Sequence, residues 1–211
     1  MIQFRTTYEL DDENSAIPVC TVMDSKNGAA FYEIEGTLIR IQVPYSVQIP
    51  FFGPILIPIF PNLFSKESFK SNIIPSISIE VIPKEGKTVN VKALEQILFF
   101  DDKKIKLDQF DYKRKIIDKD EFVSDSGMIG DKNGDFSSDL PFRITFLGDA
   151  ISLVPKEIKV TLNIKIADIL YKKELNFKKN SDWEYFPIWG ITTYPIKKCK
   201  RKLPNGKMHL F

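Results

Sequence analysis

The chain has 211 residues, and its 43% hydrophobic and 12% aromatic content can fill a substantial core, which excludes a disordered chain. The 30 basic and 28 acidic side chains leave a net charge of only +2. No global field draws such a chain to nucleic acid, so nucleic-acid binding is not expected.

The first predicted element is a hairpin near the N-terminus. Residues 19–23 and 29–43 flank Asn27 and Gly28, the dipeptide that best accommodates a type I′ turn. The apolar parity of the long return strand changes beyond Gly36, and we expect a β-bulge at that glycine.

Residues 41–65 form an apolar run without a single charged side chain. Its prolines are Pro44, Pro50, Pro54, Pro58 and Pro61. Because proline fixes φ and lacks a backbone donor, the run predicts an irregular segment and no transmembrane span.

Two interpretations of this run stay open. In one, the apolar side chains of the run contact a membrane interface, a hydrophobic ligand or a protein partner, and Phe51, Phe52 and Pro54 are the part predicted to stay exposed. In the other, the run folds over an open end of the core. Burying one large apolar side chain is worth roughly 1.5 to 3 kcal/mol. This gain in free energy favours burial for most of the run. Phe51, Phe52 and Pro54 remain as the predicted contact.

The next segments predict another hairpin and the one short helix of the chain. Residues 77–82 and 88–91 flank the polar turn 83–87 and read as an antiparallel pair. Within residues 93–99, Leu94, Ile97 and Leu98 share one helical face, which predicts a helix.

Residues 101–139 are dense in charge, and we expect a long excursion from the sheet structure with one edge hairpin. Near its end, oxygen-bearing side chains recur at alternate positions, as in the first part of a calcium-binding loop. These positions are Asp131, Asn133, Asp135, Ser137 and Asp139.

Calcium is the one cofactor that this pattern suggests, and two departures weaken it. Phe136 occupies the place of the turn glycine, and Phe142 stands where the bidentate glutamate belongs. An ordinary turn at Asn133-Gly134 is the favoured interpretation.

The clearest strands follow. Residues 140–147 alternate with period two, and residues 157–166 place five aliphatic side chains on one face before residues 169–177 resume the pattern. The last two segments predict a hairpin. Together the segments predict a single all-β domain over 1–211, an antiparallel β-sandwich that is immunoglobulin-like or related.

The C-terminal region carries aromatic residues over 183–194 and a basic tail over 197–211. These suit single-stranded nucleic acid or an anionic lipid surface, but a final strand with buried aromatics and a solvated tail is favoured. Cys20 and Cys199 are either paired or two unrelated thiols, and the second is favoured because spacing alone says nothing of their distance.

The sequence excludes several classes of function but does not single out one. His209 is the only histidine, which removes most serine–histidine and cysteine–histidine catalytic pairs. The leading interpretation is a non-enzymatic binding or structural module, of the cell envelope if a signal segment has been removed and otherwise cytoplasmic. The alternative is a carboxylate-dependent hydrolase acting on carbohydrate or another polymer, for which no acidic pair stands out.

Overall fold

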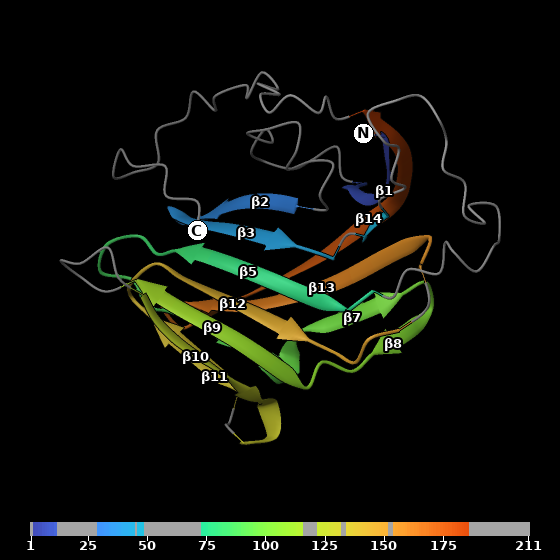
Figure 1. Ribbon diagram of the computed structural model, residues 1–211. Helices are drawn as coiled ribbons and strands as arrows, with labels where there is room; N and C mark the ends of the chain where they lie inside the picture. The colour runs from blue at the N-terminus through green and yellow to red at the C-terminus, as the bar shows by residue number, and fades with distance from the viewer. Residues whose placement is uncertain are drawn as a thin grey trace.

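The computed structural model describes residues 2–11, 29–44, 46–48, 73–115, 122–131, 134–151 and 154–185. In these residues, two antiparallel sheets lie one in front of the other (Figure 1). The period-two alternation of the sequence thus produces the all-β, sandwich-like architecture that it predicts. In the described part, no helix is long and apolar enough to cross a membrane.

The front layer in Figure 1 is a six-stranded sheet with a continuous path of neighbours. In spatial order its strands are β10 (Phe122–Met128), β9 (Gln109–Lys115), β12 (Phe142–Leu147), β5 (Ser76–Ile82), β3 (Thr37–Gln42) and β2 (Ala29–Ile34).

The second layer is an eight-stranded sheet with one branch. Its main path is β11 (Asp135–Ser138), β6 (Val89–Lys92), β13 (Glu157–Ile166), β14 (Ile169–Tyr185), β1 (Ile2–Leu10) and β4 (Ser46–Gln48). The branch is β7 (Ile97–Phe100), which pairs with β13, and β8 (Lys103–Ile105), which pairs with β7.

The core lies between the layers, where the alternate side chains of both sheets meet. The inward side chains of β13 are at most 2% exposed, and they are Ile158, Val160, Leu162, Ile164 and Ile166. Phe136 of β11 packs across the sandwich, with its ring centroid 5.1 Å from that of Phe110 on β9 and 6.0 Å from that of Phe146 on β12. Aromatic contacts at these separations stabilise the sheet-to-sheet packing.

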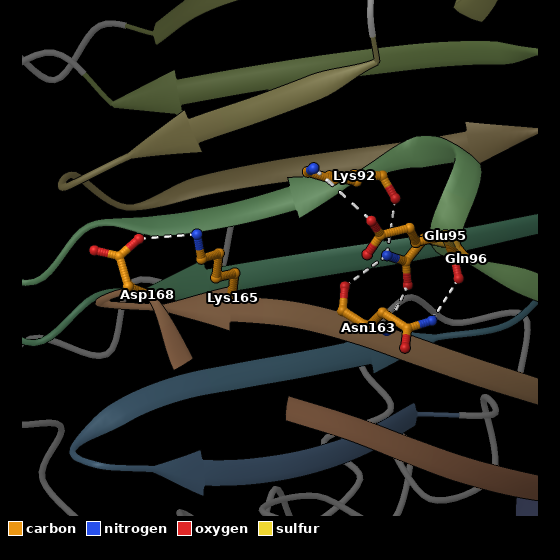
Figure 2. Close-up of polar contacts among 6 residues, drawn as sticks. All are labelled: Lys92, Glu95, Gln96, Asn163, Lys165 and Asp168. Carbon is orange, nitrogen blue, oxygen red and sulfur yellow. Dashed lines mark hydrogen bonds and ion pairs between the residues drawn. The ribbon is translucent and has the colours of Figure 1, made fainter. Parts of the chain in front are cut away.

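One edge of β13 is shared by two strands, and a side chain fills the gap between them. β6 pairs with residues 164–166 and β7 with residues 158–161. At Asn163, the Gln96 amide replaces a strand partner: its Nε2 donates to the Asn163 carbonyl at 2.7 Å, and the Asn163 N–H donates to its Oε1 at 3.0 Å (Figure 2). The side-chain amide thus continues the ladder as a peptide group would.

The helix predicted over 93–99 is wrong. The chain forms a single 3-10 turn, η1 (Ala93–Glu95), and then enters β7. Leu98 and Phe100 are buried on alternate positions, whereas Leu94 is 79% exposed. The shared helical face came from a short apolar run whose burial follows period two, because pairing with β13 determines the local structure.

The β-bulge predicted at Gly36 is also wrong. The segment is two strands, β2 and β3, joined by a turn in which Glu35 has φ 48° and Gly36 has φ 79°. Two residues with positive φ are what a type I′ hairpin turn requires. The change of apolar parity therefore marks a reversal of the chain and not an extra residue in one strand.

The hairpin predicted from residues 77–82 and 88–91 does not form. β5 pairs with β3 and β12 in the six-stranded sheet, whereas β6 pairs with β11 and β13 in the eight-stranded sheet. The turn at residues 83–88 connects the two layers. Turn chemistry predicts where the chain bends, but the partners of each strand depend on contacts distant in sequence.

The charge-dense segment 101–139 is part of both sheets rather than an excursion from them. It supplies β8 and β11 to one sheet and β9 and β10 to the other, and β9–β10 is the edge hairpin expected there. The predicted β13–β14 hairpin and the strand at β12 are confirmed. The turn at Asn27-Gly28, Cys20 and Cys199 lie outside the described residues.

Replacement of Gln96 tests whether its side chain completes the hydrogen bonding along the edge of β13. We expect Gln96→Ala to lower the free energy of unfolding by about 2 kcal/mol, because the N–H and carbonyl of Asn163 lose their partners. Urea denaturation followed by circular dichroism measures the change. Leu94→Ala is the matched control, with an expected change within about 0.5 kcal/mol because Leu94 is exposed. Equal midpoints for the two variants would contradict this role of Gln96.

Candidate functional site

The sequence-predicted contact at Phe51, Phe52 and Pro54 lies outside the described residues and stays a prediction. The same holds for the aromatic and basic C-terminal region beyond residue 185. The candidate site is therefore built from surfaces of the described sandwich.

The calcium hypothesis is also untested. Asp135 and Asp139 are exposed, Asn133 lies outside the described residues, and the side chain of Asp131 is not described. Within the described part, no group of three or more histidine, cysteine, aspartate or glutamate residues is placed to hold a metal ion. The alternation at Asp135 and Ser137 follows β11, whose intervening Phe136 enters the core.

The outer face of the eight-stranded sheet carries charges that neutralise one another. Five lysines have a carboxylate oxygen within 4.0 Å, in the pairs Lys92–Glu95, Lys159–Glu157, Lys165–Asp168, Lys172–Glu174 and Lys178–Asp11. Exposed pairs of this kind contribute little stability and leave no strong local field. This face is a solvated surface.

The outer face of the six-stranded sheet holds a compact ion network. Arg40 Nη1 lies 2.9 Å from Glu80 Oε2, and Arg143 Nη1 lies 3.6 Å from Glu80 Oε1. The three residues are cross-strand neighbours on β3, β5 and β12. Two guanidinium groups thus satisfy a carboxylate that is only 10% exposed, and we assign this row to the stability of the sheet.

A third surface is the end of the sandwich toward which the arrowheads of β2 and β5 point, on the left in Figure 1. Three turns meet there: β2–β3, β5–β6 and β13–β14. The Lys84 N–H donates to Thr37 Oγ1 at 3.3 Å, and the Ala167 N–H donates to the Thr88 carbonyl at 3.1 Å. We call these three turns the turn end.

Glu35 ties the two layers together at the turn end. Its carboxylate accepts hydrogen bonds from the Lys87 ammonium and from the Tyr171 hydroxyl, so the β2–β3 turn is joined to β14 of the other sheet and to the crossing segment. A second contact joins β14 to β2: Lys173 Nζ on β14 lies 4.9 Å from the Tyr32 ring centroid on β2, which is a cation–π contact.

These contacts shift the titration of both partners. Hydrogen bonds from Lys87 and then from Tyr171 hold the pKa of Glu35 below its ordinary value of 4.5. The hydrogen bond to Glu35 raises the pKa of Tyr171. Beside them, Lys165 Nζ lies 2.8 Å from Asp168 Oδ1 (Figure 2) and lowers the pKa of that carboxyl.

The β13–β14 turn has an unusual backbone. Ala167 has φ 46° and Asp168 has φ 72°, although neither is glycine. Aspartate tolerates this region better than alanine, which has no side-chain hydrogen bond to compensate. Strained backbone of this kind is enriched at functional sites and costs about 1 to 3 kcal/mol per residue.

Two large apolar side chains follow directly. Ile169 is 52% exposed and Leu170 is 60% exposed. Ile169 pairs with Ile166 and Leu170 pairs with Lys165. The two side chains therefore point to opposite faces of the hairpin. A turn with positive φ that presents two large apolar side chains to solvent is the most distinctive feature of the described surface, and we call Ala167 to Leu170 the tip.

No protein-family model, curated protein or solved structure matches the chain. Functional inference therefore rests on the geometry of its own residues.

Sequence reasoning predicted the hairpin but missed the tip. The signal was present: Ala167-Asp168 lacks the Asn-Gly composition usual for a two-residue turn. Ile169 and Leu170 also interrupt the alternation of apolar and polar residues. Adjacent residues of a strand point to opposite faces of the sheet, so these two side chains cannot both face the core. Their exposure depends on where the partner sheet ends, which the sequence does not show.

The backbone strain at Ala167 is testable. We expect Ala167→Asn to raise the free energy of unfolding by about 0.5 to 1 kcal/mol, since asparagine tolerates positive φ. Thermal and urea unfolding measure the gain. Ala150→Asn is the control, because Ala150 is also exposed but does not have positive φ, and its effect should be near zero. A loss of stability in Ala167→Asn would contradict the assigned strain.

The electrostatics of Glu35 give a pH prediction. Its lowered pKa means that the contact stabilises the turn end above pH 4.5 and is lost as the pH falls through the folded value. Carbon-detected NMR titration should place the Glu35 midpoint below 4.5, and Lys87→Met should raise it toward 4.5. A wild-type midpoint at or above 4.5 would refute the proposed pairing.

Proposed function

We propose that this protein is a non-enzymatic binding module that contacts a protein partner through the tip. The observation that carries the proposal is the exposure of Ile169 and Leu170 on a strained turn held by a rigid base. Two exposed apolar side chains that are adjacent in the chain give a larger apolar surface than a single one such as Leu94, and contiguous apolar surface of this kind marks contact sites.

The base of the tip is organised before any partner arrives. β13 and β14 pair along the whole of β13, and the Ala167 N–H is held by the Thr88 carbonyl. The neighbouring β2–β3 turn is fixed through Glu35. A contact surface that is already ordered loses little conformational entropy on binding, so a small apolar tip on a rigid scaffold can contribute usefully to affinity.

Charge around the tip favours a protein over an anionic membrane. Lys165 is paired with Asp168, Lys87 with Glu35, and Lys172 lies 4.0 Å from Glu174. Membrane-surface segments combine apolar side chains with cations available to lipid headgroups. The paired lysines here offer a nearly neutral rim, which suits the polar rim and apolar centre of a protein interface.

The wider setting belongs to the same proposal. We place the protein at the cell envelope as an immunoglobulin-like or related sandwich, supported by the sheet architecture and by the apolar, proline-rich run over 41–65. Phe51, Phe52 and Pro54 stay predicted as a second contact. Fractionation of the source cells tests the location, and recovery in the cytoplasmic fraction alone would overturn it.

Matched variants test the tip. We expect the double variant Ile169→Thr with Leu170→Thr to lose partner binding, with a dissociation constant raised roughly tenfold or more. Threonine keeps strand propensity, so the hairpin should persist. Leu94→Thr removes an even more exposed apolar side chain elsewhere and should bind like wild type.

The measurement is affinity capture from cell extract by the three proteins in parallel, followed by biolayer interferometry with the captured partner. The proposal requires a protein retained by wild type and by the Leu94 variant and lost by the double variant. Identical capture by all three, or no capture by wild type, would count against it.

A further inference from the structure

The edges of the two sheets differ in how well they are protected against pairing with another chain. In the eight-stranded sheet, the terminal strands of the described part are short: β4 and β8 have 3 residues each and β11 has 4. β8 also carries Lys103 and Lys104. Short, charged edges are the usual protection against unwanted strand addition.

β10 is different. It has 7 residues and, among the described strands, pairs only with β9. Its sequence FVSDSGM contains one charged residue, Asp125, and neither lysine nor proline. In an antiparallel ladder, alternate residues direct their N–H and carbonyl groups to the unpaired side. Within the described part of the chain, β10 thus presents a row of backbone donors and acceptors without the residues that usually block such a row.

The side chains of β10 are compatible with a close neighbour. Ser124, Ser126 and Gly127 are exposed and small. Val123 and Met128 are large apolar residues that are 43% and 44% exposed. Glycine within a strand commonly marks a place where another backbone comes near.

We propose that β10 pairs in antiparallel fashion with β10 of a second copy of this chain. The pairing joins the two six-stranded sheets edge to edge, satisfies the open backbone groups of the paired residues in both strands, and removes Met128 partly from water. It is independent of the tip, which belongs to the other sheet.

The sequence of β10 selects the register of this pair. In a two-fold pair that continues the sheet, residues directly opposite each other face the same side, so one residue of each copy must lie on the axis. Asp125 on the axis would set two carboxylates against each other, which is unfavourable. Ser124 on the axis would leave Met128 outside the paired segment.

Ser126 on the axis avoids both problems. It pairs residues 124–128 of the two copies, places Asp125 opposite Gly127, and places Met128 opposite Ser124. No like charges are opposed, and each large or charged side chain meets a small one. An interface of this size is at the small end for proteins, so we expect a dissociation constant on the order of 10 to 100 µM.

Charge substitutions at the axis test both the partner and the register. Ser126→Lys opposes two ammonium groups and Ser126→Glu opposes two carboxylates, so each variant alone should dimerise roughly tenfold more weakly. An equal mixture should recover the wild-type affinity, because Lys then faces Glu. Ser137→Lys places the same charge at an exposed position of β11 and is the control.

Sedimentation velocity over about 1 µM to 1 mM protein measures the association, a range that brackets the expected dissociation constant. The proposal predicts a concentration-dependent dimer for wild type and for Ser137→Lys, weakening in both Ser126 variants, and recovery in their mixture. Wild type that stays monomeric throughout, or a Ser126→Lys variant that dimerises like wild type, would overturn the β10 interface. Weakening without recovery would overturn the pairing centred on Ser126.

Discussion

The burial of one face of β13 is the constraint on which the rest of the structure depends. Its five inward aliphatic side chains are at most 2% exposed, and each contributes roughly 1.5 to 3 kcal/mol when removed from water. β13 also pairs with β14 along one edge and with β6 and β7 along the other. The register of all three neighbours is therefore fixed by which side of β13 faces the core, since a slip of one residue would turn the aliphatic face to solvent. Between the parts of β13 that pair with β6 and with β7, the side-chain amide of Gln96 bonds the backbone of Asn163.

This constraint explains how the tip tolerates strain. The positive φ values of Ala167 and Asp168 cost about 1 to 3 kcal/mol each. The five buried side chains of the adjoining strand outweigh that cost, so the turn is held in a conformation that its own residues do not favour. Ile169 and Leu170 are consequently presented in one geometry. The conformation of the tip therefore depends on burial in the sandwich and not on the sequence of the turn itself.

The sequence predicted those features that depend on local alternation. β12, β13 and the β13–β14 hairpin follow directly from period-two patterns that match burial on one face. It failed where two local explanations fit equally well: Gly36 suits a bulge or a turn, and residues 93–99 suit a helical face or the start of a strand. It also failed at residues 83–88, where a turn was recognised but the strands on either side choose partners distant in sequence. For the same reason the exposed tip was not predicted, and the edge hairpin expected within residues 101–139 was predicted without its strands or its pairing partners, because exposure and pairing are properties of the assembled sheets.

The two proposed contacts have compatible geometry. A two-fold axis perpendicular to the six-stranded sheet reverses the direction of every strand in the second copy. The β2–β3 turn, which belongs to that sheet and to the turn end, would then lie at opposite ends of the dimer in the two copies. Pairing through β10 leaves both turn ends accessible and directs them away from each other. Such a dimer would connect two partners rather than bind one of them twice, so pairing at the edge would change the arrangement of partners without adding to the affinity for a single one.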